Sequence, residues 1–170
     1  MDIDAFKTSW AGLMRTMSVI DPATGLPTAD FVRAYAQAPM SLAETDLPSW
    51  IFFTGPARYP VPPDQTYERL AKETRDFTAR LYVLPAQAGI DGEAERRVQP
   101  YVDIARDLMQ RHVQLWAGNP YDEPVGINRA YLVSDTGIVG NLVYGKTQYA
   151  GIAFTVRVEA VNEVNYATNQ

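Results

Sequence analysis

The sequence predicts a single α+β domain over residues 1–170, in which a mainly antiparallel sheet of four to five strands is flanked by two main helices. Three observations predict this. Apolar and polar residues alternate from Ile152 to Ala160, which is typical of a half-buried strand. Apolar residues recur at helical spacing in two stretches, 2–17 and 92–116. Short turns join the candidate strands of the carboxyl-terminal part, which favours antiparallel pairing.

The composition supports one globular domain. The chain has 170 residues, of which 46% are hydrophobic and 21% charged, and it shows no internal repeat or domain boundary. It contains no cysteine, which excludes disulfide scaffolds, thiolate metal sites and thiol nucleophiles. Its longest apolar runs are only a few residues, and its amino end lacks a basic region followed by an apolar core. We therefore expect neither a membrane span nor a secretory signal.

The first helix is expected over residues 2–17, where Asp2 or Asp4 is placed to cap its start. Turn-forming residues then end the helical pattern. Residues 21–45 form a possible inserted element, in which 30–38 is expected to be a short helical segment.

The α+β core is expected over residues 46–165. It begins with a short apolar strand at 49–54, which Gly55–Pro56 is expected to close. A second strand is expected over about 66–84, and its alternation is clearest from Phe77 to Val83.

A long helix and three strands complete the prediction. The helix is expected over 92–116, with one apolar stripe along it. Pro100 lies inside this window, so either the helix proper starts just before Pro100 or it kinks there. Strands are expected at 130–133 and 138–144, and the last strand at about 148–164.

Residues Gly140 to Thr147 match the phosphate-loop pattern G-x-x-x-x-G-K-[ST]. A phosphate loop binds phosphate at the N-terminus of the helix that follows it. Here a predicted strand follows Thr147, so the helix is missing. We interpret the segment as a hairpin in which Gly145 makes the turn and Lys146 is a turn residue. A nucleotide-binding enzyme that uses this loop is the alternative of a different class.

No other pattern predicts catalysis. His112 is the only histidine, and its place on the apolar stripe of the long helix indicates a packed residue. The acidic stretch from Asp91 to Glu95 precedes the same helix, where carboxylates complement the helix dipole. We therefore expect no catalytic residue, no cofactor and no metal site, and we do not expect an enzyme.

Charged and aromatic residues on the predicted strands form a candidate contact surface. Charges are dense from Asp64 to Arg80, and the simpler interpretation is a solvated strand face. The sharper interpretation is a contact with another subunit or a partner, because charge pairs set partner choice and register. The candidate interface residues are Trp50, Tyr59, Tyr67, Arg69, Lys72, Arg75, Arg80, Arg157 and Glu159.

A family resemblance covers residues 45–165. The strand around 75–83 leads to the long helix, and the last strand opens with the pattern of Tyr149, Gly151 and Phe154. This arrangement resembles tail terminator proteins of long-tailed bacteriophages, which are small α+β proteins without a catalytic signature.

The resemblance implies a structural virion protein. Such a protein forms a ring, expected to be a homohexamer, that caps the tail tube at its head-proximal end and connects it to the neck. The implied partners are further copies of the chain, the tail tube protein, a neck or connector protein, and genomic DNA that passes through without sequence-specific binding. The implied location is the tail–neck junction of the virion, after assembly in the host cytoplasm, with no membrane partner.

The charge fits this expectation, and two alternatives stay open besides the nucleotide-binding enzyme. A net charge of −5 argues against a general nucleic-acid binder and suits a channel that DNA passes without being gripped. One alternative is another neck or head–tail connector, or a tail tube component. The other is a small-molecule or peptide binding module with an exposed sheet edge.

Overall fold

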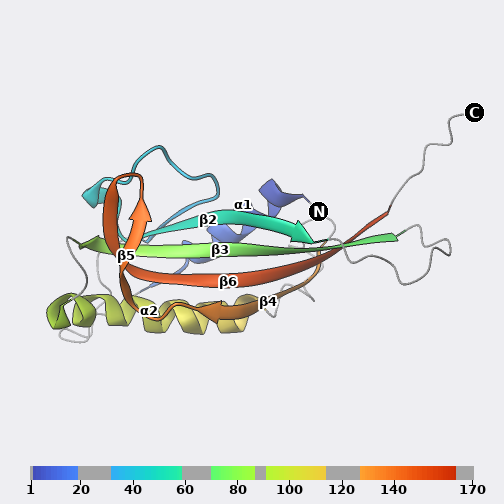
Figure 1. Ribbon diagram of the computed structural model, residues 1–170. Helices are drawn as coiled ribbons and strands as arrows, with labels where there is room; N and C mark the ends of the chain where they lie inside the picture. Colours follow the sequence, from blue (N-terminus) through green and yellow to red (C-terminus); the bar gives the residue numbers. More distant parts are fainter. Residues whose placement is uncertain (1, 19–31, 59–69, 87–90, 114–126, 164–170) are drawn as a thin grey trace, which may run out of the picture.

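The computed structural model describes residues 2–18, 32–58, 70–86, 91–113 and 127–163. It confirms the α+β fold, although the described sheet has six strands and is larger than predicted. The helices are α1 (Ile3–Met14), the short 3₁₀ helix η1 (Glu44–Asp46) and α2 (Gly92–Val113). The strands are β1 (Arg33–Tyr35), β2 (Ser49–Arg58), β3 (Leu70–Ala86), β4 (Ile127–Asp135), β5 (Val139–Tyr144) and β6 (Thr147–Glu163) (Figure 1).

The strand order places β3 and β6 at the centre of the sheet. The order is β1-β2-β3-β6-β4, and β5 also pairs with β6. Only β1 and β2 are parallel among the described pairs, and the others are antiparallel. β4 pairs with residues 154–160 of β6, and β5 pairs with 147–151 of the same strand. β4 and β5 therefore follow one edge of β6 in succession (Figure 1).

Alternate residues of these strands build one large core. Rows of register partners cross the sheet, and one of them joins Phe52, Ala79 and Phe154. Both helices pack on this face, because their buried side chains belong to the same apolar cluster as these strand residues. The helix residues in the cluster are Phe6, Trp10, Ala11 and Met14 of α1 and Val98, Val102, Ala105 and Met109 of α2.

Both α-helices begin at an aspartate. The Asp2 carboxylate accepts a hydrogen bond from the Ala5 N–H at 3.0 Å, as the sequence predicted for α1. The Asp91 carboxylate accepts one from the Ala94 N–H at 2.7 Å at the start of α2. The helix starts at Gly92, as predicted, and Pro100 lies inside it, so the alternative in which the helix proper starts just before Pro100 is wrong.

Two predictions in the amino-terminal half are wrong. Residues 33–35 form β1 rather than part of a short helix, because Ala34 is buried between exposed Arg33 and half-buried Tyr35 in a strand-like alternation. β2 does not end at Gly55–Pro56 but continues to Arg58 through a bulge. Among the described residues, only 49–51 of β2 pair on its other side, and a bulge in the part without such a partner tolerates a proline, which has no N–H to donate.

Candidate interaction surface

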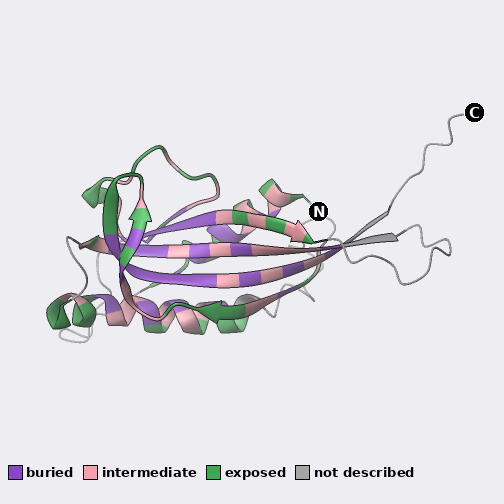
Figure 2. Cartoon of the chain, in the orientation of Figure 1, coloured by how far each residue is buried: buried purple, intermediate pink, exposed green. Residues whose placement is uncertain are grey.

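The sheet has a second face that carries neither α1 nor α2. Because side chains alternate along a strand, the residues between those of the core point to this side. At the end of the sheet where Ile51, Tyr82 and Ala153 lie they are buried, but over the rest of this face they are half-buried or exposed, as the banding of the strands in Figure 2 shows. We define the open face as Phe53, Asp76, Thr78, Arg80, Arg129, Tyr131, Thr155, Arg157 and Glu159.

An ion pair lies at the centre of the open face. Asp76 and Arg157 are register partners on β3 and β6. Their side chains make two bonds, Nε to Oδ1 at 2.7 Å and Nη2 to Oδ2 at 3.0 Å. The hydrogen bond from Arg157 lowers the pKa of Asp76, and the same bond raises the pKa of Arg157. A two-bonded arginine–carboxylate pair fixes both side chains in one orientation.

Side-chain contacts on the open face also involve β4. The Tyr131 hydroxyl donates to the Glu159 carboxylate at 3.1 Å. The guanidinium of Arg129 lies over the Tyr131 ring, 5.0 Å from its centroid. On the β4 side of the open face, the exposed Arg129 is therefore positioned by a cation–π contact with Tyr131.

Arg80 is fixed on the β2 side of the open face. Its guanidinium lies 4.8 Å from the centroid of the Phe53 ring, and its Nη1 donates to the carbonyl of Val143 at 3.4 Å. The open face thus presents arginines and aromatic rings in defined orientations across four strands, β2, β3, β6 and β4.

A strap, residues 36–47, covers one end of the same side of the sheet. Its Leu42 and Leu47 pack against a second apolar cluster. The buried members of that cluster are Ile51, Tyr82, Leu142, Tyr149 and Ala153.

Two tyrosines of the β5–β6 hairpin hold the strap in place. The Tyr144 hydroxyl donates to the carbonyl of Pro39, and the Tyr149 hydroxyl donates to the carbonyl of Leu42 at 3.1 Å. The ring of Tyr82 lies between them, 5.7 Å and 5.3 Å from the two rings in edge-on contacts. Burial raises the pKa of both Tyr82 and Tyr144.

The segment Gly140 to Thr147 is a hairpin, as predicted. Tyr144 pairs with Thr147, and Gly145 has a φ of +61°, which a residue with a side chain rarely adopts. Lys146 is an exposed turn residue. The chain continues directly as β6, so this segment has no following helix N-terminus to receive a phosphate.

Three of the predicted interface residues lie on the open face: Arg80, Arg157 and Glu159. Arg75 does not, because in the alternation along β3 it falls on the same side as the core residues. Its Nε and Nη2 donate to Glu73 Oε1 at 3.0 Å and 2.8 Å. Tyr59, Tyr67 and Arg69 lie outside the described residues. Lys72 pairs with Val161 through its backbone, but its side chain lies outside the described part.

Trp50, one of the predicted interface residues, does not lie at the surface of the subunit. Its side chain has 0% exposure and lies in the main core. Its ring is stacked with that of Phe52 at 6.4 Å and lies 5.8 Å from that of Phe154. A side chain buried within its own subunit cannot contact a partner, so Trp50 is not part of the candidate surface.

The prediction missed six open-face residues: Phe53, Asp76, Thr78, Arg129, Tyr131 and Thr155. Asp76 could have been found, because side chains alternate along a strand and Asp76 therefore points to the same side as Arg80. The pairing of Asp76 with Arg157 joins residues 81 positions apart, and no local pattern encodes that register.

Other candidate chemistry is limited within the described ranges. No group of three or more acidic or histidine side chains there could hold a metal ion. His112 lies in α2, but its side chain is outside the described part. Asp91 caps α2, and Glu93 and Glu95 are exposed in its first turn. None of the described helices is long and apolar enough to cross a membrane.

No family model matches this sequence, and no curated protein matches it either.

Proposed function

We propose that the protein is a structural ring subunit, and that the ring is the tail terminator of a long-tailed bacteriophage. The observation that carries the proposal is the open face, with its arginines and aromatic rings held by contacts between strands. This surface is the one through which copies of the chain assemble.

The composition of the open face supports a protein contact. Arginine and aromatic residues are enriched at protein–protein interfaces, where they supply most of the binding free energy. The contacts of Arg157 and Arg80 within the subunit already restrict their side chains. Less conformational entropy is therefore lost when a partner binds.

The two ends of the sheet support a ring rather than a symmetric dimer. The described strand order begins with the short β1, beside the strap, and ends with β4, beside α2. These two edges differ in length, composition and neighbouring elements. Contacts between unlike surfaces are heterologous, and they form closed rings when the rotation between copies closes.

The resemblance of residues 45–165 to tail terminators supplies the finer part of the proposal. The ring caps the tail tube at its head-proximal end and joins it to the neck, within the virion. Its partners are the tail tube protein, a neck or connector protein and the DNA that passes through. The net charge of −5 is compatible with DNA passage without tight binding.

Native mass spectrometry of the purified full chain tests the ring. We expect one closed oligomer, a hexamer by the resemblance, and a ring in electron micrographs of the same sample. A strict monomer over the whole concentration range, both alone and with the tail tube protein, would contradict the proposal.

A second experiment tests the position of the ring. A tagged copy of the chain, labelled with gold in purified phage particles, should be found at the head-proximal end of the tail. Label at the distal tip, or no label on particles, would contradict the terminator role while leaving the ring itself intact.

A further inference from the structure

We propose that the partner on the β4 side of the open face is the strap of the next copy. In this contact Met40 of one subunit packs against Val133 of its neighbour, and Glu44 of the first approaches Arg129 of the second. The inference rests on the proposed ring and names the contact that builds it.

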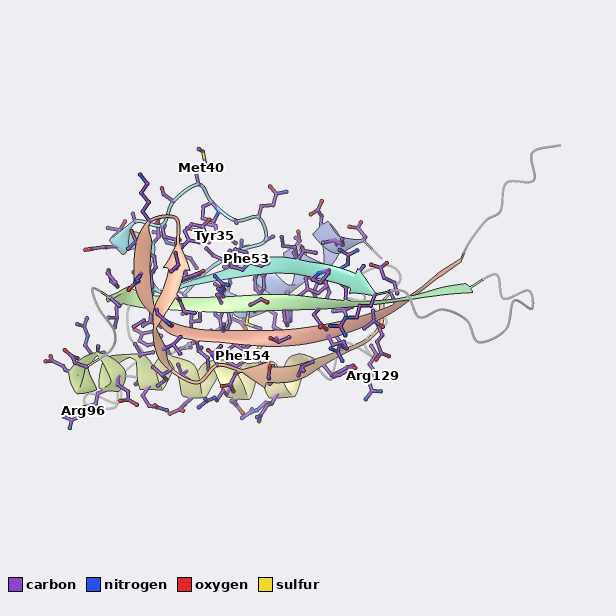
Figure 3. All side chains as sticks on the ribbon, viewed as in Figure 1. Tyr35, Met40, Phe53, Arg96, Arg129 and Phe154 are labelled. Carbon is purple, nitrogen blue, oxygen red and sulfur yellow. The ribbon has the colours of Figure 1, made fainter. Side chains whose placement is uncertain are left out.

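Met40 is an exposed apolar residue at a fixed position. Its relative exposure is 103%, the highest of any large hydrophobic residue in the described chain. The backbone on both sides of it is held, because the carbonyls of Pro39 and Leu42 accept hydrogen bonds from Tyr144 and Tyr149. Figure 3 shows its side chain pointing away from the sheet. An exposed methionine on a fixed backbone is suited to fill a partner's surface.

The far end of the strap is also tied to the sheet. Arg33 of β1 forms an ion pair with Asp46, and the Ser49 hydroxyl donates to the carbonyl of the same residue. The strap is therefore anchored before and after Glu44, which is exposed between these contacts. It can present Met40 and Glu44 together without first becoming ordered.

Val133 is an exposed apolar residue at the opposite edge of the sheet. It lies on β4, beside the irregularity between Leu132 and Ser134, and its relative exposure is 45%. The strap follows β1, which is the other end of the strand order. Apolar residues at opposite edges cannot meet within one subunit, but they meet in a head-to-tail contact between copies.

The charges at the two edges are complementary. Glu44 is an exposed acid on the strap, and Arg129 is an exposed base on β4. Figure 3 shows Met40 and Arg129 at opposite edges of the sheet, as a head-to-tail contact requires. Opposite charges beside an apolar pair favour this partner and this register over others.

Disulfide trapping tests the contact directly, because the natural chain has no cysteine. A chain that carries Met40→Cys and Val133→Cys should form disulfides between neighbouring copies under mild oxidation. Non-reducing gels should then show a ladder of covalent oligomers up to the size of the ring. A disulfide requires Cα atoms about 4.4–6.8 Å apart, so the ladder reports close approach.

Three controls make the trapping specific. Each single cysteine variant should stay free of the ladder, since Met40 meets Val133 and not its own equivalent. A chain with Met40→Cys and Glu93→Cys should also give no ladder, because Glu93 is exposed at the start of α2, away from the contact. Dimers formed by Met40→Cys alone would indicate a symmetric contact and would overturn the proposal.

A charge exchange provides an independent test. Glu44→Arg and Arg129→Glu should each raise the concentration for half-assembly about tenfold, because each places like charges together. The chain with both changes should recover most of that loss. No recovery in the double variant would overturn the pairing of these two residues.

The outcomes separate this contact from the proposed function. If the natural chain forms a ring but the double-cysteine chain gives no ladder, the contact is wrong and the ring stands. If the natural chain is a strict monomer, both are wrong.

Discussion

The helix-covered face and the open face are built from alternate residues of the same strands, but different interactions organise them. On β6, Phe154 has 0% exposure and packs with Trp50 beneath the helices, whereas its neighbour Thr155 is half-exposed on the other side. Two residues further on, Arg157 binds Asp76 across the strands. One face excludes water through apolar packing, and the other arranges polar groups that water still reaches.

This difference assigns separate tasks to the two faces. Burial of large apolar side chains contributes most of the free energy of folding. Half-exposed ion pairs contribute little, because water screens them and their long side chains lose entropy. Residues of the open face can therefore serve contact with a partner, and changes there should leave the fold almost as stable. The following predictions test that contrast.

The largest effect is expected in the core. Phe154→Ala should lower the free energy of unfolding by about 3–5 kcal/mol, because it removes a fully buried ring and leaves a cavity. Its neighbour Thr155→Ala is the matched control on the open face and should change stability by less than about 0.5 kcal/mol. Urea denaturation of both variants measures this, and similar losses for the two would contradict the assigned contrast.

A smaller loss is expected from Gly151→Ala. A Cβ at this position would lie 1.9 Å from the Leu81 carbonyl oxygen of the paired strand. The backbones must move apart, which should destabilise the fold by about 1–3 kcal/mol. Gly12→Ala is the control, because nothing lies within 4 Å of its added Cβ in α1. That variant should gain about 0.5–1 kcal/mol, and thermal unfolding should separate the two.

Tyr149→Phe should have a moderate effect. It removes the hydrogen bond to the Leu42 carbonyl, and the lost bond should reduce stability by about 1 kcal/mol. Amide exchange in the strap should rise at the same time, since one of its two tyrosine anchors is gone. Unchanged exchange there would show that the strap is held by other contacts.

The smallest effect is expected from Asp76→Asn, and it should depend on pH. The hydrogen bond from Arg157 lowers the pKa of Asp76 below its ordinary value of 3.8. Its contribution is therefore complete above that value and is lost as the pH falls through the lower, folded-state pKa. The small stability difference between natural chain and variant at pH 6 should shrink as the pH falls below 3.8. A difference that grows in acid would contradict the ion pair.

Local patterns were sufficient to predict most elements. Alternation around Phe154 identified β6, and helical spacing identified α1 and α2. Trp50 was misassigned because Trp50, Ile51 and Phe52 are all buried, two of them in the main core and Ile51 in the cluster beneath the strap. A strand buried on both sides shows no alternation, so sequence alone gave no sign of which side each residue faces.

Pairings distant in sequence could not be predicted. β1 is three residues long, and its parallel pairing with β2 depends on tertiary context rather than on propensity. The open face depends on the register of β3 against β6, which aligns Asp76 with Arg157. Charge density along 64–80 pointed to a contact surface, but the prediction did not extend the alternation of Phe77 to Val83 back along the strand, which places Arg75 on the core side and Arg80 on the open face.

The most direct test of the central claim compares one arginine on each face. Arg129 is exposed on the open face, and Arg96 is exposed on α2. Native mass spectrometry at equal concentration should find the natural chain and Arg96→Glu assembled as the same closed oligomer. Arg129→Glu should be mainly monomeric under those conditions. Equal assembly of both variants, or loss of assembly in Arg96→Glu alone, would contradict the assignment of the open face as the assembly surface.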